Sequence, residues 1–265
     1  MVRGIQIVCV ALAGIVSAGM ATVDGCLATA PGASDRYRVR IASEDSLTNP
    51  LAAEVVDGWR IEFARALVVI GDVSVQYITS TSDEILVDAP AYRVYDLTTA
   101  TGSTGEIVAE GDVNNLSRFV RVNNAFRVAP DPDATAANAA DSDVEFMTMN
   151  GYSVYLELTA TKDNVTKSFA LGFDRNFGSC FGSEITAERP FDAIGEFNAE
   201  GLFVQFTNGV ASPDIQRFVM ADADDDGEVT AAELAAVDSG TNNRTLLQLL
   251  EGRISSINPG ACAVP

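Results

Sequence analysis

Apolar and polar residues alternate with a period of two through most of residues 36–208, and this alternation limits the fold more than any other feature. At the start of the segment, Tyr37, Val39 and Ile41 are each preceded by an arginine. Because successive side chains of a strand point to opposite faces, such a segment buries one face and exposes the other. Gly, Asn, Asp and Pro separate the alternating segments at short intervals. We therefore expect a mainly β fold, with an antiparallel β-sandwich over residues 36–208.

The pattern changes in residues 209–265, which favour helices. Ser212 is a typical helix cap, Pro213 suits the first helical position, and Asp214 lies near the positive end of the helix dipole. Apolar residues at helical spacing continue from there to Glu251. We expect a helical C-terminal segment that follows the sandwich.

Six carboxylates and one glycine lie within the twelve residues 222–233, and this segment contains no Lys or Arg. Calcium binds six to eight oxygen ligands, which a short acidic turn can supply. The side chains of Asp222, Asp224 and Asp226 can converge because they are two residues apart, and Gly227 permits the turn. The carboxylates of an empty loop repel one another, and a bound cation relieves this repulsion. The loop therefore predicts a calcium site.

Residues 222–233 are similar to the EF-hand calcium-binding loop along all twelve positions. The resemblance implies calcium as the cofactor and a helix on each side of the loop, here over residues 213–221 and 231–237. The implied ligands are Asp222, Asp224, Asp226, the main-chain carbonyl of Glu228, Thr230 directly or through water, and Glu233 with two oxygens. EF-hands usually pair through a short strand, and we find a single hand, with Val229 at the strand position. A single hand implies a structural calcium site rather than a sensor.

Residues 1–25 are typical of a secretory signal. Arg3 supplies a positive charge, and an uncharged apolar stretch over residues 5–23 follows it. A stretch of this length is also long enough to remain as an uncleaved membrane anchor. Both alternatives predict export of the chain.

The sequence VDGC at residues 23–26 resembles the lipobox of bacterial lipoproteins. This resemblance implies cleavage before Cys26 and attachment of a lipid to it, with residues 26–35 as a tether. The protein would then be held at the outer membrane or the cell surface. The alternative is ordinary cleavage after Ala18 or Ala21, which would leave the protein periplasmic or secreted.

The use of the four cysteines agrees with export. Cys9 lies in the leader and Cys26 would carry the lipid, so Cys180 and Cys262 remain. Two cysteines in an exported domain are most simply one disulfide, which would close a loop of roughly 80 residues. Two free buried thiols are the alternative.

Charge and histidine content exclude several functions. The formal charge is −20, with 37 acidic and 17 basic residues, which argues against nucleic acid as a partner. The chain has no histidine, so a Ser-His-Asp triad and a His-ligated metal are excluded. We expect a protein that is not an enzyme: a lipid-anchored calcium-binding protein whose β-sandwich is structural or binds an unidentified ligand.

Two other functions remain open on the sequence alone. A calcium-dependent adhesion or carbohydrate-binding module would show exposed aromatic residues near the calcium loop. A carboxylate-based hydrolase would show two acidic residues that converge in a cleft of the β domain.

Overall fold

Strands dominate the computed structural model, which describes residues 36–43, 45–51, 57–78, 83–99, 105–112, 120–185, 191–197, 199–207, 210–240 and 242–254. All of these belong to one unit, Ser34–Pro265. The leader, the tether with Cys26, and Cys262 lie outside the described residues. The predicted signal, lipid attachment and disulfide therefore stay predictions.

The elements confirm the prediction of a mainly β fold. The strands are β1 (Arg36–Ser43), β2 (Arg60–Ile78), β3 (Asp83–Ala89), β4 (Arg93–Asp96), β5 (Glu106–Asp112), β6 (Val120–Val128), β7 (Thr135–Ala136), β8 (Val154–Lys162), β9 (Val165–Phe173), β10 (Phe177–Ile185), β11 (Phe191–Phe197), β12 (Val204–Thr207), β13 (Val210–Pro213) and β14 (Glu228–Val229). The helices are α1 (Asp45–Thr48), α2 (Asp141–Asn150), the 3-10 helix η2 (Glu200–Leu202), α3 (Ile215–Val219), α4 (Ala231–Ala236) and α5 (Leu246–Ile254).

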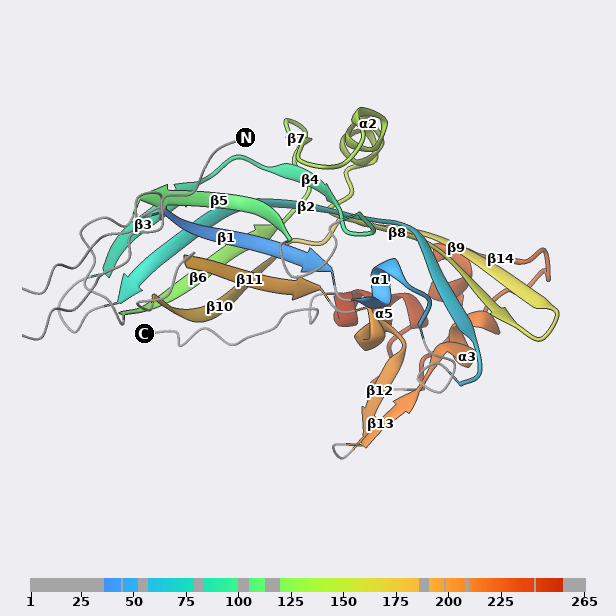
Figure 1. The fold of residues 1–265 in the computed structure, drawn as a ribbon. Coiled ribbons are helices and arrows are strands. Elements are labelled where there is room, and N and C mark those ends of the chain that lie inside the picture. Colours follow the sequence, from blue (N-terminus) through green and yellow to red (C-terminus); the bar gives the residue numbers. More distant parts are fainter. Residues whose placement is uncertain are drawn as a thin grey trace, which may run out of the picture. The chain divides into compact units, whose positions relative to one another are not determined.

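Most of the described strands belong to one large sheet, which is built around β2 (Figure 1). The order along this sheet is β10-β6-β2-β8-β9-β14, while β3 and β4 also pair with β2, and β7 pairs with β4. Because β2 is 19 residues long, it can hold four partner strands at different points along its length. A second sheet has the order β11-β1-β5, and β12 pairs with β13.

Three pairs of described strands run parallel, and the other pairs are antiparallel. The parallel pairs are β1 with β11, β4 with β7, and β14 with β9. The sheets are therefore mixed, and the expectation of purely antiparallel pairing is wrong at these places. Alternation of apolar residues sets which face of a strand is buried, but it carries no information on the direction of the neighbouring strand.

One apolar core includes both sheets and the C-terminal helices. Val39 of β1 and Ile61 of β2 are fully buried in it. Phe218 of α3, Leu234 of α4 and Leu246 of α5 are buried in the same cluster. The C-terminal segment is thus fixed to the β domain by shared apolar side chains. Within the described part of the chain, no helix is both long enough and apolar enough to cross a bilayer.

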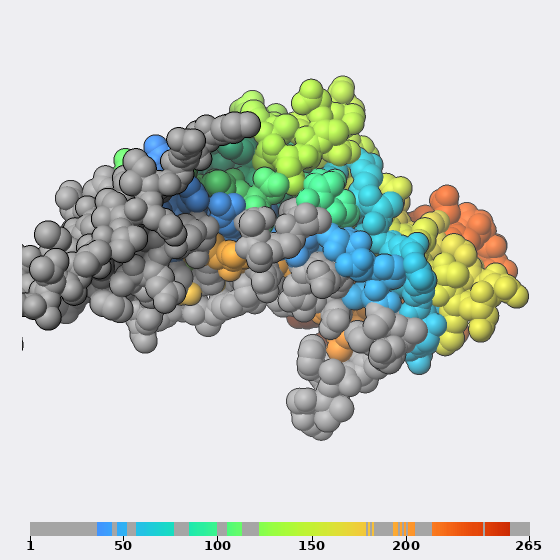
Figure 2. All heavy atoms as spheres, viewed as in Figure 1, coloured from blue at the N-terminus to red at the C-terminus, as the bar shows by residue number. Residues whose placement is uncertain are grey.

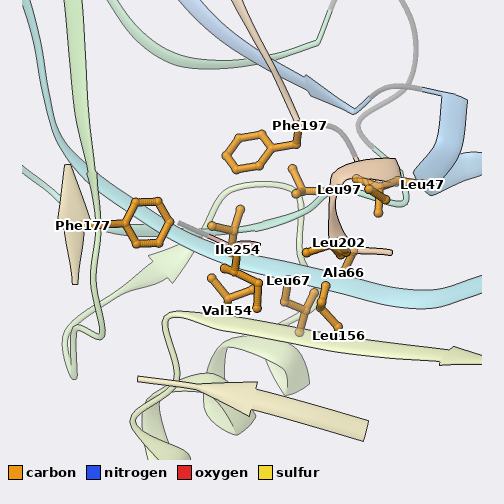
Figure 3. Close-up of a pocket in the computed structure, with 12 residues that line it drawn as sticks. Leu47, Ala66, Leu67, Leu97, Val154, Leu156, Phe177, Phe197, Leu202 and Ile254 are labelled. Atoms are coloured by element: carbon orange, nitrogen blue, oxygen red, sulfur yellow. The ribbon is translucent and has the colours of Figure 1, made fainter. Parts of the chain in front are cut away.

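A small cavity lies in this core where β2 and β8 approach α1, α5 and η2 (Figure 3). Its volume is about 30 Å³, which is room for about one water molecule. Its lining side chains are Leu47, Ala66, Leu67, Val68, Leu97, Val154, Leu156, Phe177, Phe197, Ala199, Leu202 and Ile254. Because all of these are apolar and the volume is small, the cavity is a gap in the packing rather than a binding site.

Candidate metal centre

The acidic loop connects α3 to α4 through a turn that needs left-handed backbone conformations. Asp225 has a φ of 59° and Gly227 a φ of 91°. Aspartate tolerates the left-handed region better than most residues, and glycine adopts it without strain. Both therefore suit a turn that brings residues two positions apart to the same side of the loop. The helices around it are shorter than predicted, with α3 ending at Val219 and α4 at Ala236. The predicted start of the first helix is also wrong, because Ser212 and Pro213 belong to β13 and the N-cap of α3 is Asp214.

The three aspartates predicted as ligands each accept a hydrogen bond from the main chain of the loop. Asp222 Oδ2 accepts from Gly227 N at 3.0 Å, Asp224 Oδ1 from Asp226 N at 3.4 Å, and Asp226 Oδ1 from Glu228 N at 2.7 Å. One carboxylate oxygen from each aspartate lies within 4.8 Å of the other two. The loop thus gathers three negatively charged oxygen donors around one point.

Asp222 has an oxygen that the protein itself leaves without a partner. Its side chain is only 1% exposed, and its Oδ1 is buried and forms no hydrogen bond. A buried carboxylate oxygen without a partner is costly, so its partner is expected to be a group outside the chain. The three aspartates and this oxygen together fit a hard divalent cation, whose preferred ligands are carboxylate oxygens.

The other predicted ligands have different positions. Glu233 Oε1 accepts from Ala223 N at 2.8 Å, and Oε2 accepts from Thr230 N at 2.8 Å and Thr230 Oγ1 at 2.9 Å. Thr230 is also the N-cap of α4 and accepts from Glu233 N, which completes a capping box. Glu233 therefore ties the start of the loop to its end, and it is not part of the three-aspartate group. Glu228 lies in β14 with an exposed side chain, and the role of its carbonyl stays a prediction.

Hydrogen bonds to Glu233 have an electrostatic consequence. The main-chain N–H of Thr230, followed by that of Ala223, lowers the pKa of the Glu233 carboxyl below its ordinary value. These donors stabilise the charged form of the carboxylate.

A lysine from the sheet also contacts the loop. Lys167 of β9 places its Nζ 2.5 Å from Asp222 Oδ2 and 3.0 Å from Asp225 Oδ1. The hydrogen bond between Lys167 and Asp222 lowers the pKa of the Asp222 carboxyl and raises the pKa of the Lys167 ammonium. The loop itself contains no Lys or Arg, but β9 provides a lysine 55 residues before Asp222. No pattern in the sequence links these segments, because their contact depends on the pairing of the sheet.

The loop also contains β14, the last strand of the large sheet. β14 pairs in parallel with β9, with Glu228 opposite Ser168 and Val229 opposite Phe169. Ser168 N donates to Gly227 O at 2.9 Å, and Val229 is buried. Val229, the apolar residue of the loop, thus contacts the edge of the sheet. Figure 2 shows the C-terminal segment, in orange, beside residues of the β8–β9 region, in yellow.

A cluster of ionic groups around one buried carboxylate fixes the first helix of the site. Asp214, at the N-cap of α3, accepts from Arg217 Nε at 2.5 Å and from Arg253 Nη2 of α5 at 2.6 Å. Arg217 Nη1 donates to Ser239 O beyond α4, and Arg253 Nη1 donates to Leu202 O of η2. One buried carboxylate therefore connects the segments on both sides of the acidic loop.

A groove of about 320 Å³ opens beside the loop. The Trp59 ring in its wall is only 4% exposed, and its Nε1 donates to Gln216 Oε1 at 3.0 Å. The other lining residues are Lys162, Asp163, Val165, Lys167, Val219, Met220, Asp222 and Asp225. Within the described residues, this groove lacks the exposed aromatic face that a carbohydrate-binding module would show.

Comparisons of the chain with models of known protein families, with curated proteins and with solved structures give no match. Cys180 lies in β10. Its expected partner Cys262 is outside the described residues, so this pairing is not tested.

Proposed function

We propose that this chain is an exported calcium-binding protein in which the ion holds the C-terminal helical segment on the edge of the large sheet. The observation that carries the proposal is the unpartnered Oδ1 of Asp222, within a group of three converging aspartates. Asp222, Asp224 and Asp226, which converge, would hold the ion. Glu228, Thr230 and Glu233, which lie outside the three-aspartate group, are the further proposed ligands. No enzymatic reaction is assigned to the chain.

The donor set favours calcium over other cations. It consists of carboxylate, hydroxyl and carbonyl oxygens, and the chain has no histidine to favour zinc or copper. Calcium accepts irregular shells of six to eight oxygens, whereas magnesium requires a nearly ideal octahedron. When bound, calcium would neutralise the acidic loop and satisfy Asp222 Oδ1.

The place of the loop in the fold supports a structural role for the ion. β14 is part of the sheet, and α3 and α4 contribute to the shared core. An ion that binds only the folded loop stabilises the fold by RT ln(1 + [L]/Kd), about 1.4 kcal/mol when its concentration is tenfold above Kd. The Kd expected for an extracellular structural site is on the order of 10⁻⁴–10⁻³ M.

Two finer parts of the proposal concern export and architecture. Export and lipid attachment are supported by Arg3, the apolar stretch at residues 5–23 and the VDGC sequence ending at Cys26. The two sheets are proposed as the layers of a β-sandwich, which is supported by the side chains that both give to one core. The ligand of this β domain is not assigned.

Calorimetric titration of the purified chain with calcium tests the proposal. We expect one site in the native chain and no measurable binding in Asp226→Asn, which keeps the acceptor for Glu228 N but removes a charge. The matched control is Asp174→Asn, an identical change at an exposed aspartate between β9 and β10. Absence of binding by the native chain at about 10 mM calcium, well above the expected Kd, would refute the calcium site.

Mass spectrometry of the exported chain tests lipid attachment. We expect an N-terminal peptide that begins at Cys26 and carries acyl chains, and Cys26→Ser should lose them. A mature N-terminus at residue 19 or 22, which follows from cleavage after Ala18 or Ala21, would show a secreted protein instead.

A further inference from the structure

The acidic loop has a counter-ion that belongs to the chain itself. Lys167 reaches from β9 to Asp222 and Asp225, and its side chain is only 11% exposed. Most of its side chain is therefore covered by other residues, and its ammonium contacts the loop. Six carboxylates repel one another in the empty loop, and Lys167 is the cation that the described residues place in direct contact with two of them.

Lys167 and the expected calcium ion use different oxygens of the same carboxylate. Asp222 Oδ2 accepts from Lys167 Nζ and from Gly227 N, whereas Oδ1 has no partner. The lysine therefore does not block the oxygen that would bind the ion. Its charge nevertheless lies one carboxyl group away from that oxygen, where it repels a divalent cation.

We propose that Lys167 is a tethered counter-ion that holds the empty loop against β9 and, by its charge, weakens calcium binding at this loop. The inference rests on the proposed calcium site. It makes Lys167 the residue that sets the affinity of the site, although it lies outside the loop and is not a ligand.

The opposite effect on affinity would follow if Lys167 were needed to orient Asp222 toward the ion. The structure argues against this, because Gly227 N already holds Asp222 Oδ2 at 3.0 Å, and the capping hydrogen bonds of Glu233 close the loop without the lysine. Loss of Lys167 therefore relieves the repulsion of the ion, while Gly227 N still orients Asp222.

The consequence is a loop that is folded in both states. Lys167 stabilises the loop when no ion is bound, and calcium adds to this when it is present. Such a loop changes its stability with calcium concentration without a large change in structure.

The test compares native chain, Lys167→Met, Lys167→Arg and a matched control, Lys162→Met. Methionine keeps most of the aliphatic length and removes the charge, and arginine keeps the charge. Lys162 lines the same groove but donates to Asp57 O at 2.7 Å, so it tests whether removal of any nearby positive charge is sufficient. Calcium affinity is measured by calorimetry, and hydrogen exchange of residues 222–233 is measured in chelator.

We expect Lys167→Met to bind calcium on the order of tenfold more tightly than the native chain, because a unit charge near a divalent ion is worth about this much at a partly exposed site. In chelator, the same variant should exchange its loop amides faster than the native chain. Lys167→Arg and Lys162→Met should resemble the native chain in both measurements. If Lys167→Met does not fold, Lys167→Gln repeats the affinity measurement, since it also lacks the charge.

The outcomes separate this inference from the calcium site itself. Native and Lys167→Met chains that both bind calcium with equal affinity, or weaker binding by the variant, would overturn the inference and leave the calcium site intact. Equal tightening in Lys162→Met would also overturn it, because the effect would then not belong to Lys167. If neither the native chain nor Lys167→Met binds calcium, the proposed function fails together with the inference.

Discussion

Replacement of Asp214 by asparagine is expected to lower the free energy of unfolding by about 3 kcal/mol. The carboxylate is buried, and it accepts hydrogen bonds from both Arg217 and Arg253. Removal of one partner from a buried ion pair costs about 3–5 kcal/mol, because the remaining charge is buried without compensation. The lower end of this range applies because only one of the two guanidinium groups is deeply buried. The side chain of Arg253 is 11% exposed, whereas that of Arg217 is 35% exposed and can turn toward water.

A double-mutant cycle measures the Asp214–Arg253 interaction directly. Asp214→Asn, Arg253→Met and the double variant are unfolded with urea in the presence of chelator, so that calcium does not contribute. We expect the cost of the double variant to be smaller than the sum of the single costs by about 2 kcal/mol, since residues in contact are not additive. Asp174→Asn, at an exposed position, is the control and should change stability by less than about 0.5 kcal/mol.

Two results would refute this reasoning. A cost below about 1 kcal/mol for Asp214→Asn would mean that the carboxylate is no more important than an exposed ion pair. Additive single costs would mean that Asp214 and Arg253 act independently. In either case the ionic cluster would not be what fixes α3 relative to α5.

Three further predictions concern the loop and the core. Gly227→Ala should destabilise the loop by about 1–2 kcal/mol and weaken calcium binding, because a φ of 91° strains any residue other than glycine. Space is not the cause, since the nearest atom to an added Cβ is 3.9 Å away. Thermal unfolding measures the stability, and calorimetry measures the calcium affinity. Ala66→Val should raise the free energy of unfolding by about 0.5–1 kcal/mol by filling the small cavity, and urea unfolding that shows a loss would mean that the cavity cannot accept the added methyl groups. The pKa values of Asp222 and Glu233 are lowered from 3.8 and 4.5, so the stability that these groups contribute is present above these values and is lost as the pH falls through the lower, folded-state pKa values. The protection factors of the amides of residues 222–233 in chelator, which correct for the intrinsic pH dependence of exchange, should therefore be high at pH 6 and fall below about pH 4, and constant protection over this range would contradict the prediction.

The acidic loop could be predicted from the sequence because its geometry is local. Asp222, Asp224 and Asp226 converge through hydrogen bonds to the loop's own main chain, and Gly227 supplies the turn. Lys167 could not be predicted in the same way. Its contact depends on the register of β9 against β14, and register is a property of the folded sheet rather than of either segment alone.

The same difference between local and non-local information decides which elements of the fold could be predicted. The clear alternation of Tyr37, Val39 and Ile41 predicts a strand where the structure has β1. The helix α2 was not predicted, because Met147 is its only fully buried residue and no apolar stripe marks it. Gly151, which ends α2 with a φ of 65°, and the acidic residues Asp141 and Asp143 in its first turn are the signals that could have indicated it.

The parallel pairing of β1 with β11 has a consequence for how the chain acquires its structure. Tyr37 lies opposite Phe191. β1, the first described strand, therefore cannot pair with β11 until the chain from β2 to β10 has been synthesised. Contacts between residues so far apart in sequence close slowly, because the chain entropy between them is lost before the contact forms. If the chain crosses a membrane unfolded and N-terminus first, β1 emerges early and remains without this partner for most of the passage. Arginines at alternate positions of β1, which place charge on one of its faces, would then protect the edge that awaits β11 from association with other chains during that interval.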